Sequence, residues 1–136
     1  ATVKADLRLE DAKMEDYAGF ILPCMMVASY PEPEISPVTM RLVQEAVAAG
    51  KPVAAQTGSL WTLAKAGVLK GKKYAYAFAE KHRYFEGAVF AGTGVVRDGL
   101  VLTSGLCPHM ARTMKVADGT EGLALAFAEA MKEKKP

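Results

Sequence analysis

The chain has 136 residues, a length typical of one domain, and 51% of them are hydrophobic, which excludes an intrinsically disordered protein. Its 17 basic and 15 acidic residues leave a net charge of +2, too balanced for the clustered basic field of a nucleic-acid-binding surface. Two cysteines cannot make a disulfide framework, and no run approaches the ~20 apolar residues of a membrane-spanning helix.

The first predicted element is a strand at residues 20–22, an apolar run stopped by Pro23. Its composition favours a strand buried on both faces, as in a parallel sheet. Three prolines follow within seven residues and predict an extended connection; they are Pro31, Pro33 and Pro37.

A helix is predicted next, with Ser36 as its N-cap and Pro37 at its first helical position. Apolar residues recur at helical spacing from Val38 to Ala49, and Gly50 stands where a C-terminal cap belongs.

The middle of the chain reads as strand, abrupt turn and helix. The run "KPVAA" (residues 51–55) predicts a short strand, and residues 58–66 predict a helix that ends at Gly67. The run "KKYAYAFA" (residues 72–79) alternates loosely and is interpreted as a strand.

The last third predicts a hairpin and a helix. Asp98-Gly99 is a favoured two-residue turn between apolar runs. Asp118 and Glu121 have the spacing of a capping box, and an apolar stripe marks the helix that follows: Leu123, Phe127, Ala130 and Met131.

Strands that alternate with helices indicate an α/β fold with a mainly parallel sheet. Ligands of such sheets bind beyond the carboxyl ends of the strands. Three segments follow predicted strands in this way, "LPCMM", "AAQTGS" and "TSGLCPHM", and we expect them to meet at one edge of the sheet.

These three segments, with the helix and hairpin between them, resemble the ThiJ/PfpI family of the class I glutamine amidotransferase-like superfamily. The run "QTGSLWTLAKAGVLKG" is most similar to the isocyanide hydratase-like branch, which has Cys-Thr-Gly at its nucleophile elbow. The resemblance implies a flavodoxin-like three-layer sandwich and self-association, because homodimers are common in the family.

The resemblance extends from about Asp16 to the last helix, and the family's N-terminal strands have no counterpart. A sheet without its central first strand has unpaired edges. We therefore expect residues 1–136 to be the C-terminal portion of a single domain, completed by a missing N-terminal segment or by a second polypeptide.

The family's nucleophilic cysteine falls on Gln56, whereas the following Thr57 and Gly58 are retained. A cysteine suits this turn because a thiol pKa falls at a helix N-terminus. Gln56 cannot ionise but can donate and accept hydrogen bonds. It either satisfies local backbone groups or binds a polar ligand or a neighbouring carboxylate.

Both cysteines lie in loops that the resemblance turns toward the elbow. Cys24 stands where the family usually has glycine, and Cys107 lies two residues before His109. Buried inert thiols, a displaced nucleophile with His109 as its base, a redox pair and a partial metal site all remain open.

Three aromatic residues carry weaker expectations. His82 lies among charges and is interpreted as a solvated surface histidine. Tyr76, near a family site histidine, either lines the pocket or packs in the core. Trp61 is expected to pack in the core or at a dimer contact.

The sequence therefore predicts a diverged small-molecule-binding or regulatory protein without the family's cysteine chemistry. Its expected pocket comprises Gln56, Thr57, Gly58, Cys24, Met25, Cys107 and Pro108. Two alternatives are an enzyme of hydrolase, hydratase or redox type that uses Cys107 or Cys24 with His109, and a structural subunit that completes another chain's sheet. We expect a cytoplasmic location, because the cysteine content fits a reducing compartment, and no metal, other cofactor, nucleic acid or membrane.

Overall fold

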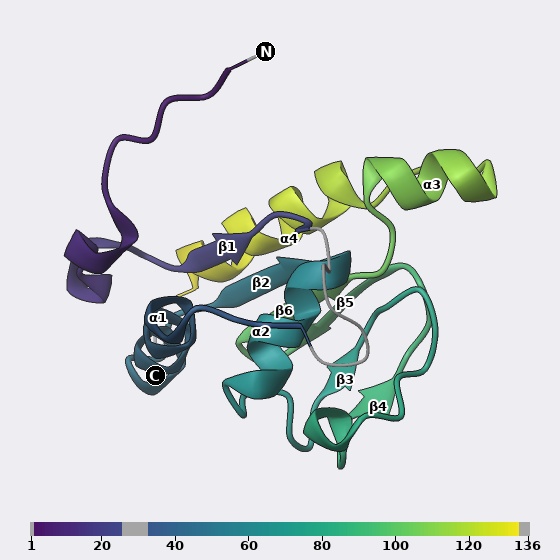
Figure 1. The fold of residues 1–136 in the computed structure, drawn as a ribbon, viewed down its shortest axis with the longest axis horizontal. Helices are drawn as coiled ribbons and strands as arrows, with labels where there is room; N and C mark the ends of the chain where they lie inside the picture. Colours follow the sequence, from purple (N-terminus) through teal and green to yellow (C-terminus); the bar gives the residue numbers. More distant parts are fainter. Residues whose placement is uncertain (1, 26–32, 134–136) are drawn as a thin grey trace.

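The computed structural model describes residues 2–25 and 33–133, which form two sheets and the helices around them (Figure 1). The α-helices are α1 (Pro37–Ala48), α2 (Leu60–Lys65), α3 (Pro108–Met114) and α4 (Thr120–Lys132). The strands are β1 (Phe20–Leu22), β2 (Val53–Gln56), β3 (Lys73–Tyr74), β4 (Val89–Phe90), β5 (Val95–Asp98) and β6 (Val101–Ser104). Single 3₁₀ turns occupy Leu9–Asp11, Met14–Asp16, Thr57–Ser59 and Arg83–Phe85.

The main sheet has the strand order β1-β2-β6-β5. β1 and β6 both run parallel to β2, and β5 pairs with β6 in an antiparallel hairpin. Strands β3 and β4 form a separate parallel pair. The sheet is therefore mixed but mainly parallel, as the alternation of strands and helices predicts.

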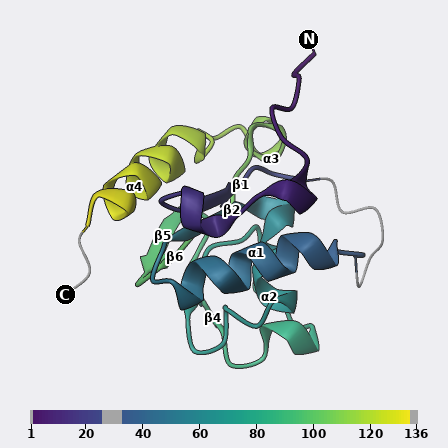
Figure 2. The same ribbon diagram turned by 90° about the vertical axis from the view of Figure 1, so that its left-hand side faces the viewer.

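Helices cover both faces of the main sheet, so the domain has three layers. Figure 2 shows α4 on one side of the sheet, with α1 and α2 on the other. On the α4 side, Leu123 and Phe127 pack against Ala54 and Leu102. The predicted three-layer α/β sandwich is confirmed.

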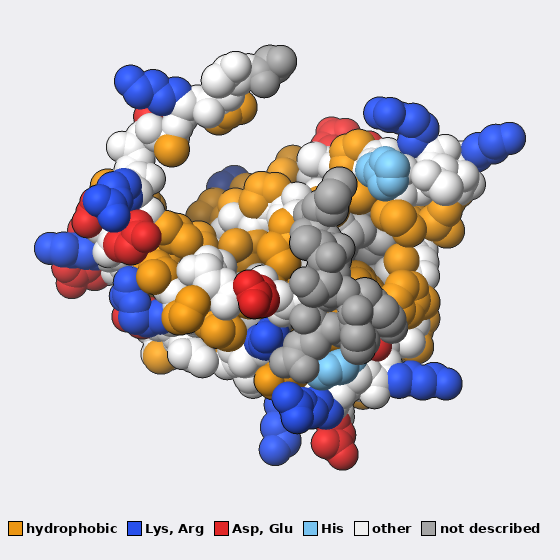
Figure 3. All heavy atoms as spheres, viewed as in Figure 1, with side chains coloured by type: hydrophobic (Ala, Val, Ile, Leu, Met, Phe, Trp, Pro, Cys, Tyr) orange, Lys and Arg blue, Asp and Glu red, His pale blue; other side chains and the backbone are white. Residues whose placement is uncertain are grey.

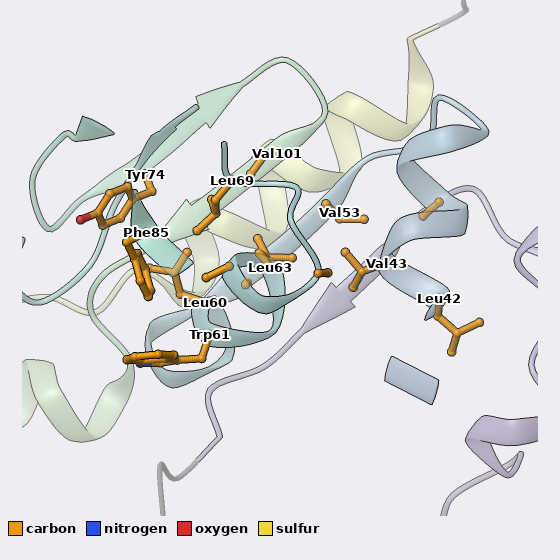
Figure 4. Close-up of a cluster of buried hydrophobic side chains, with 14 of the residues drawn as sticks. Leu42, Val43, Val53, Leu60, Trp61, Leu63, Leu69, Tyr74, Phe85 and Val101 are labelled. Atoms are coloured by element: carbon orange, nitrogen blue, oxygen red, sulfur yellow. The ribbon is translucent and has the colours of Figure 1, made fainter. Parts of the chain in front are cut away.

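The larger core lies between the sheet and the α1–α2 layer (Figure 4). Trp61 is fully buried there, packs edge-on against Phe85 and donates its ring N–H to the hydroxyl of Tyr76 at 3.3 Å. The expectation that Trp61 packs in the core is confirmed, because α2 turns almost its entire surface inward. The other labelled core residues are Leu42, Val43, Val53, Leu60, Leu63, Leu69, Tyr74 and Val101.

The predicted positions of the two ends of α1 are also confirmed. Pro37 opens the helix, and Gly50 follows it with a φ of 70°, a left-handed conformation that suits glycine. The Ser36 side chain makes no capping hydrogen bond, so only its position agrees with the prediction. Part of the predicted extended connection, including Pro31, lies outside the described residues.

Three local predictions are wrong in detail. β1 is an edge strand with Ile21 39% exposed, so it is not buried on both faces. The hairpin turn is Gly99-Leu100, one residue later than predicted, because Asp98 still pairs with Val101. Only Lys73–Tyr74 of the run at 72–79 forms a strand.

The start of α4 also differs from the predicted capping box. Asp118 accepts a hydrogen bond from the amide of Thr120 at 2.8 Å, and Gly119 occupies the N-cap position. The Asp118 carboxylate still satisfies an amide of the first turn, but by a shorter reach than the predicted pairing with Glu121.

On the face in Figure 3, Lys and Arg side chains are dispersed around the periphery, with hydrophobic side chains between them. None of the helices in residues 2–25 and 33–133 has the length and apolar character needed to cross a bilayer.

Candidate functional site

The turn after β2 contains one of the two non-glycine residues with a left-handed φ in the described backbone, the other being Lys115. Thr57 has a φ of 45°, a left-handed value that costs a β-branched residue about 1–3 kcal/mol. Gln56 has an ordinary extended conformation (φ −112°, ψ 128°) and pairs with Ser104 as the last residue of β2. The tip of the elbow is therefore Thr57 and not Gln56, because pairing with β6 extends β2 by one residue.

The side-chain amide of Gln56 makes hydrogen bonds to other residues of the chain. Its side chain is buried, and its Nε2 donates to the carbonyl of Leu106 at 3.3 Å and to Oγ1 of Thr120 at 3.0 Å. These two bonds join the end of β2 to the loop before α3 and to the first turn of α4. Gln56 thus satisfies local polar groups, the first of the two roles considered for it.

A cavity of about 350 Å³ lies beside the elbow. Ten described residues line it: Cys24, Met25, Thr57, Gly58, Tyr76, Ala77, Phe78, Cys107, His109 and Met110. Three chain segments distant in sequence therefore meet here, as expected for loops at the carboxyl ends of parallel strands. Gln56 and Pro108 are not among these lining residues.

Cys107 lies where this cavity meets the start of α3. It is the N-cap residue of the helix, and its sulfur accepts a hydrogen bond from the amide of Met110 at 3.5 Å. The side chain is only 3% exposed to solvent. Its position resembles that of a capping serine, with sulfur in place of oxygen.

The surroundings favour the anionic form of the Cys107 thiol. Burial is the largest single effect and raises its pKa, but hydrogen bonds outweigh burial and the net pKa lies below the ordinary value. The groups that lower the pKa are the amide of Met110, the hydroxyl of Thr57, the side chain of Cys24 and the amide of His109, and of these the Met110 amide makes a hydrogen bond of standard geometry. A thiol with a lowered pKa is more reactive near neutral pH.

Thr57 contributes a polar group directed at the same cavity. Its side chain is 5% exposed, and its Oγ1 makes no hydrogen bond of standard geometry with any described group. It nevertheless lies near enough to the Cys107 sulfur to lower the pKa of that thiol. A buried hydroxyl in this state can donate to a thiolate or to a ligand oxygen.

A hydrogen bond joins the loop that carries Cys24 to the elbow. The hydroxyl of Ser59 donates a short hydrogen bond to the carbonyl of Pro23, the residue before Cys24. Cys24 is exposed, unlike Cys107, and its sulfur lies 3.8 Å from the carbonyl oxygen of Met25. Ser59 therefore joins α2 to the β1 loop, and its side chain makes no capping hydrogen bond to its own helix.

The two histidines occupy different environments. His109 lines the cavity with an exposed side chain, and it is its backbone amide that acts on the Cys107 thiol. His82 is half-buried, packs edge-on against Trp61 and accepts a hydrogen bond from the amide of Tyr84 at 3.4 Å. The prediction of a solvated His82 is wrong, because its ring packs against Trp61 and stacks on Tyr84.

The aromatic wall of the cavity follows β3. Tyr76 lines the cavity and is also 92% buried, so it fulfils both roles considered for it. Its ring lies 5.0 Å from that of Phe78. Phe78, Ala77 and Met110 were not predicted, because only the folded chain brings residues 76–78 next to α3.

Helix α3 itself was also missed by the sequence analysis. The available signal was Cys107-Pro108, since proline is favoured at the first helical position. The segment that contains α3 begins after Leu106 and ends before Gly119. The amide of Gly119 donates a hydrogen bond to the carbonyl of Leu106 at 2.8 Å, which joins the two ends of this segment.

A larger hollow of about 500 Å³ lies between Met14 and α1. Its lining includes Arg41 and Glu45, which form an exposed ion pair at 2.8 Å. Solvated side chains of this kind offer no reactive group, so the smaller elbow cavity is the better candidate site. Among the described residues, no group of three or more His, Cys, Asp or Glu side chains is arranged to hold a metal ion.

Several known proteins are similar to this chain in sequence or structure. An uncharacterized protein of Archaeoglobus fulgidus is 34% identical over 104 residues, which cover 75% of this chain and 60% of that protein. The chain thus spans less than two thirds of this relative's length.

Two solved structures share the fold. A two-domain protein of Anabaena variabilis with DJ-1/ThiJ/PfpI-like and ferritin-like domains matches 93% of this chain and 40% of its own (TM-score 0.56, 19% identity). Drosophila melanogaster DJ-1beta matches 88% of this chain and 60% of its own (TM-score 0.54, 21% identity). The model of the DJ-1/PfpI family matches residues 1–115, and the chain belongs to that family.

Proposed function

We propose that the elbow cavity binds a small electrophilic molecule and that Cys107 attacks it as a nucleophile. In this proposal the elbow carries no thiol, because Gln56 stands where the family places its cysteine, and the chemistry has moved to the facing loop. The observation that carries it is the Cys107 thiol, which lines the cavity beside Thr57 and has a lowered pKa.

The proposed first step is addition of the Cys107 thiolate to an electrophilic carbon, such as that of a carbonyl group. The carbon–sulfur bond forms while the carbonyl electron pair moves to its oxygen. The hydroxyl of Thr57, which makes no hydrogen bond of standard geometry with any described group and lies near the Cys107 sulfur, is the donor we assign to that oxygen. We assign proton transfer to the imidazole of His109, which lines the same cavity.

The cavity also constrains the substrate. Its volume of about 350 Å³ lies near the lower end of small-molecule sites, which span roughly 300–1,000 Å³. Met25, Phe78 and Met110 provide much of the wall. These side chains favour a compact, largely apolar molecule with one polar reactive group.

The test is turnover together with labelling. Native protein and the Cys107→Ser variant are assayed with small carbonyl, amide and isonitrile substrates, and each is treated with iodoacetamide before peptide mapping. We expect alkylation of Cys107 in the folded protein, and turnover of at least one substrate that the variant loses. Labelling of Cys107 only after denaturation would overturn the proposal.

A second candidate is a binding or regulatory protein without turnover. It is favoured by His109, whose imidazole is exposed while only its backbone amide acts on the Cys107 thiol. A ligand that moves Tyr76 would be detected by Trp61, because the indole N–H is bonded to the Tyr76 hydroxyl. Saturable changes in Trp61 fluorescence without product would support this candidate.

A third candidate, strand addition at the sheet edge, rests on β1. This strand is paired with β2 on one side, and Ile21 is 39% exposed although it lies within a strand. An exposed edge is a template for another strand. A second polypeptide that co-purifies with the chain and protects the amides of residues 20–22 from hydrogen exchange would support this role.

A further inference from the structure

The only two thiols of the chain face one cavity although they come from distant loops. Cys24 follows β1 and Cys107 precedes α3, and both line the space beside the elbow. The Cys24 side chain also lies near enough to the Cys107 sulfur to lower the pKa of that thiol. A disulfide needs Cβ atoms roughly 3.5–4.5 Å apart, a separation that cysteines on two walls of one small cavity can reach.

Neighbouring side chains of the elbow hold both loops. Ser59 binds the carbonyl of Pro23, immediately before Cys24. Gln56 binds the carbonyl of Leu106, immediately before Cys107. Because one turn anchors the backbone immediately before each cysteine, the juxtaposition of the two loops is built into the fold.

The two thiols differ in a way that assigns them different roles. Cys107 is buried at a helix start among hydrogen-bond donors, whereas Cys24 is exposed and has a single long contact of 3.8 Å with the Met25 carbonyl oxygen. A buried, stabilised thiolate suits the attacking sulfur, and a more accessible neighbour suits the resolving one.

We infer that a hydroperoxide converts Cys24 and Cys107 into a reversible disulfide across the elbow cavity, with Cys107 as the attacking thiol and Cys24 as the resolving thiol. The inference rests on the nucleophilicity of Cys107 proposed above. It adds a second reaction for that sulfur and a way to switch the site off.

The chemistry balances in two steps. The Cys107 thiolate attacks one peroxide oxygen, so that a sulfur–oxygen bond forms, the oxygen–oxygen bond breaks and an alcohol or water leaves after taking up a proton. Sulfur is oxidised to a sulfenic acid and the peroxide is reduced. Cys24 then attacks this sulfur, the sulfur–sulfur bond replaces the sulfur–oxygen bond, and water leaves with the proton of the Cys24 thiol. A dithiol reductant restores both thiols.

The disulfide would close the site. It removes the nucleophile and places two bonded sulfur atoms between the β1 loop and α3, the two walls on which the cysteines lie. Oxidised protein should therefore neither react with iodoacetamide at Cys107 nor bind a ligand in the cavity, and treatment with dithiothreitol should restore both properties.

The experiment compares the wild type with Cys24→Ser and Cys107→Ser after equimolar hydrogen peroxide at low protein concentration. Free thiols are blocked, and intact masses and non-reduced peptides are measured, with dimedone present in parallel samples. The wild type should lose two hydrogen atoms and yield a Cys24–Cys107 peptide. Cys24→Ser, which keeps a hydroxyl donor, should stop at a dimedone-trapped sulfenic acid on Cys107, and Cys107→Ser should show neither product.

Two results would overturn the inference, and they have different meanings. If Cys107 is alkylated by iodoacetamide but peroxide yields the same sulfenic acid in the wild type and Cys24→Ser, or only disulfides between molecules, this inference alone fails. If Cys107 of the folded, reduced protein reacts with neither iodoacetamide nor peroxide, the proposed function fails with it.

Discussion

Gln56 donates its amide hydrogen to the carbonyl of Leu106, the residue immediately before Cys107. Gln56, the last residue of β2, therefore holds the loop that brings Cys107 to the elbow cavity. The carbonyl of Leu106 also accepts a hydrogen bond from the amide of Gly119, so the two ends of the segment that contains α3 are joined at this point. Gln56 is thus a positioning residue in this account, and Cys107 is the reactive one.

Replacing Gln56 by methionine keeps its length but removes both hydrogen bonds. We expect unfolding free energy to fall by about 0.5–1.5 kcal/mol and alkylation of Cys107 to slow several-fold. Gln44→Met is the matched control, because Gln44 donates to the carbonyl of Ala66 at 3.0 Å on another part of the fold. That variant should lose similar stability in urea denaturation with no change in Cys107 reactivity. An equal effect of both variants on Cys107 would contradict the positioning role.

The hydroxyl of Thr57 is expected to set the pH at which Cys107 becomes reactive. Thr57→Val removes the donor and retains the shape, so the pKa of Cys107 should rise and the alkylation profile should move to higher pH. Thr57→Ser keeps the hydroxyl and should leave the profile near that of the wild type. Identical profiles for the two variants would show that this hydroxyl does not act on the thiol.

Gly105 is predicted to tolerate no side chain. A Cβ atom there would lie 2.6 Å from the carbonyl oxygen of Tyr76 and 2.9 Å from that of Thr93, both parts of the backbone. Gly105→Ala should lower the unfolding free energy by about 1–3 kcal/mol, since neither carbonyl can move cheaply. Gly94→Ala meets no atom within 4 Å and should change stability by less than about 0.5 kcal/mol. Thermal unfolding of the two variants gives the comparison.

The core between the sheet and α2 should dominate stability. Leu63 is fully buried, and Leu63→Ala is expected to cost about 2–5 kcal/mol by creating a cavity in this core. Leu125 on α4 is 64% exposed, so Leu125→Ala should cost less than about 0.5 kcal/mol. Urea denaturation followed by Trp61 fluorescence measures both. Similar losses in the two variants would contradict this assignment of the core.

Local signals were enough to predict much of the fold. Pro37 and Gly50 mark the ends of α1 because both act through their own backbone conformations. The wrong predictions concern features that depend on strand pairing or on tertiary packing, such as where a strand ends and which side chains are buried. Gln56 extends β2 because it meets Ser104 of β6, and His82 is half-buried because the chain folds it against Trp61.

The candidate site was predicted only in part. Both cysteines and His109 were expected near the elbow from the loops that carry them, and the structure brings them to one cavity. The residue with the left-handed φ is Thr57, one position after Gln56, on which the resemblance places the family's nucleophile. The aromatic wall at residues 76–78 has no local signal in the sequence. The pairing of Ser59 with Pro23 and of Gln56 with Leu106 likewise depends on contacts far apart in sequence.

The pH dependence of Cys107 alkylation tests the central claim most directly. In the Cys24→Ser variant, Cys107 is the sole thiol, so iodoacetamide incorporation reports on it alone. Because the pKa of Cys107 is lowered, the rate in folded protein should rise with pH to a plateau, with its midpoint below the value of about 8.5 for a free thiol. A midpoint at or above that value, or alkylation that requires denaturant, would contradict the account.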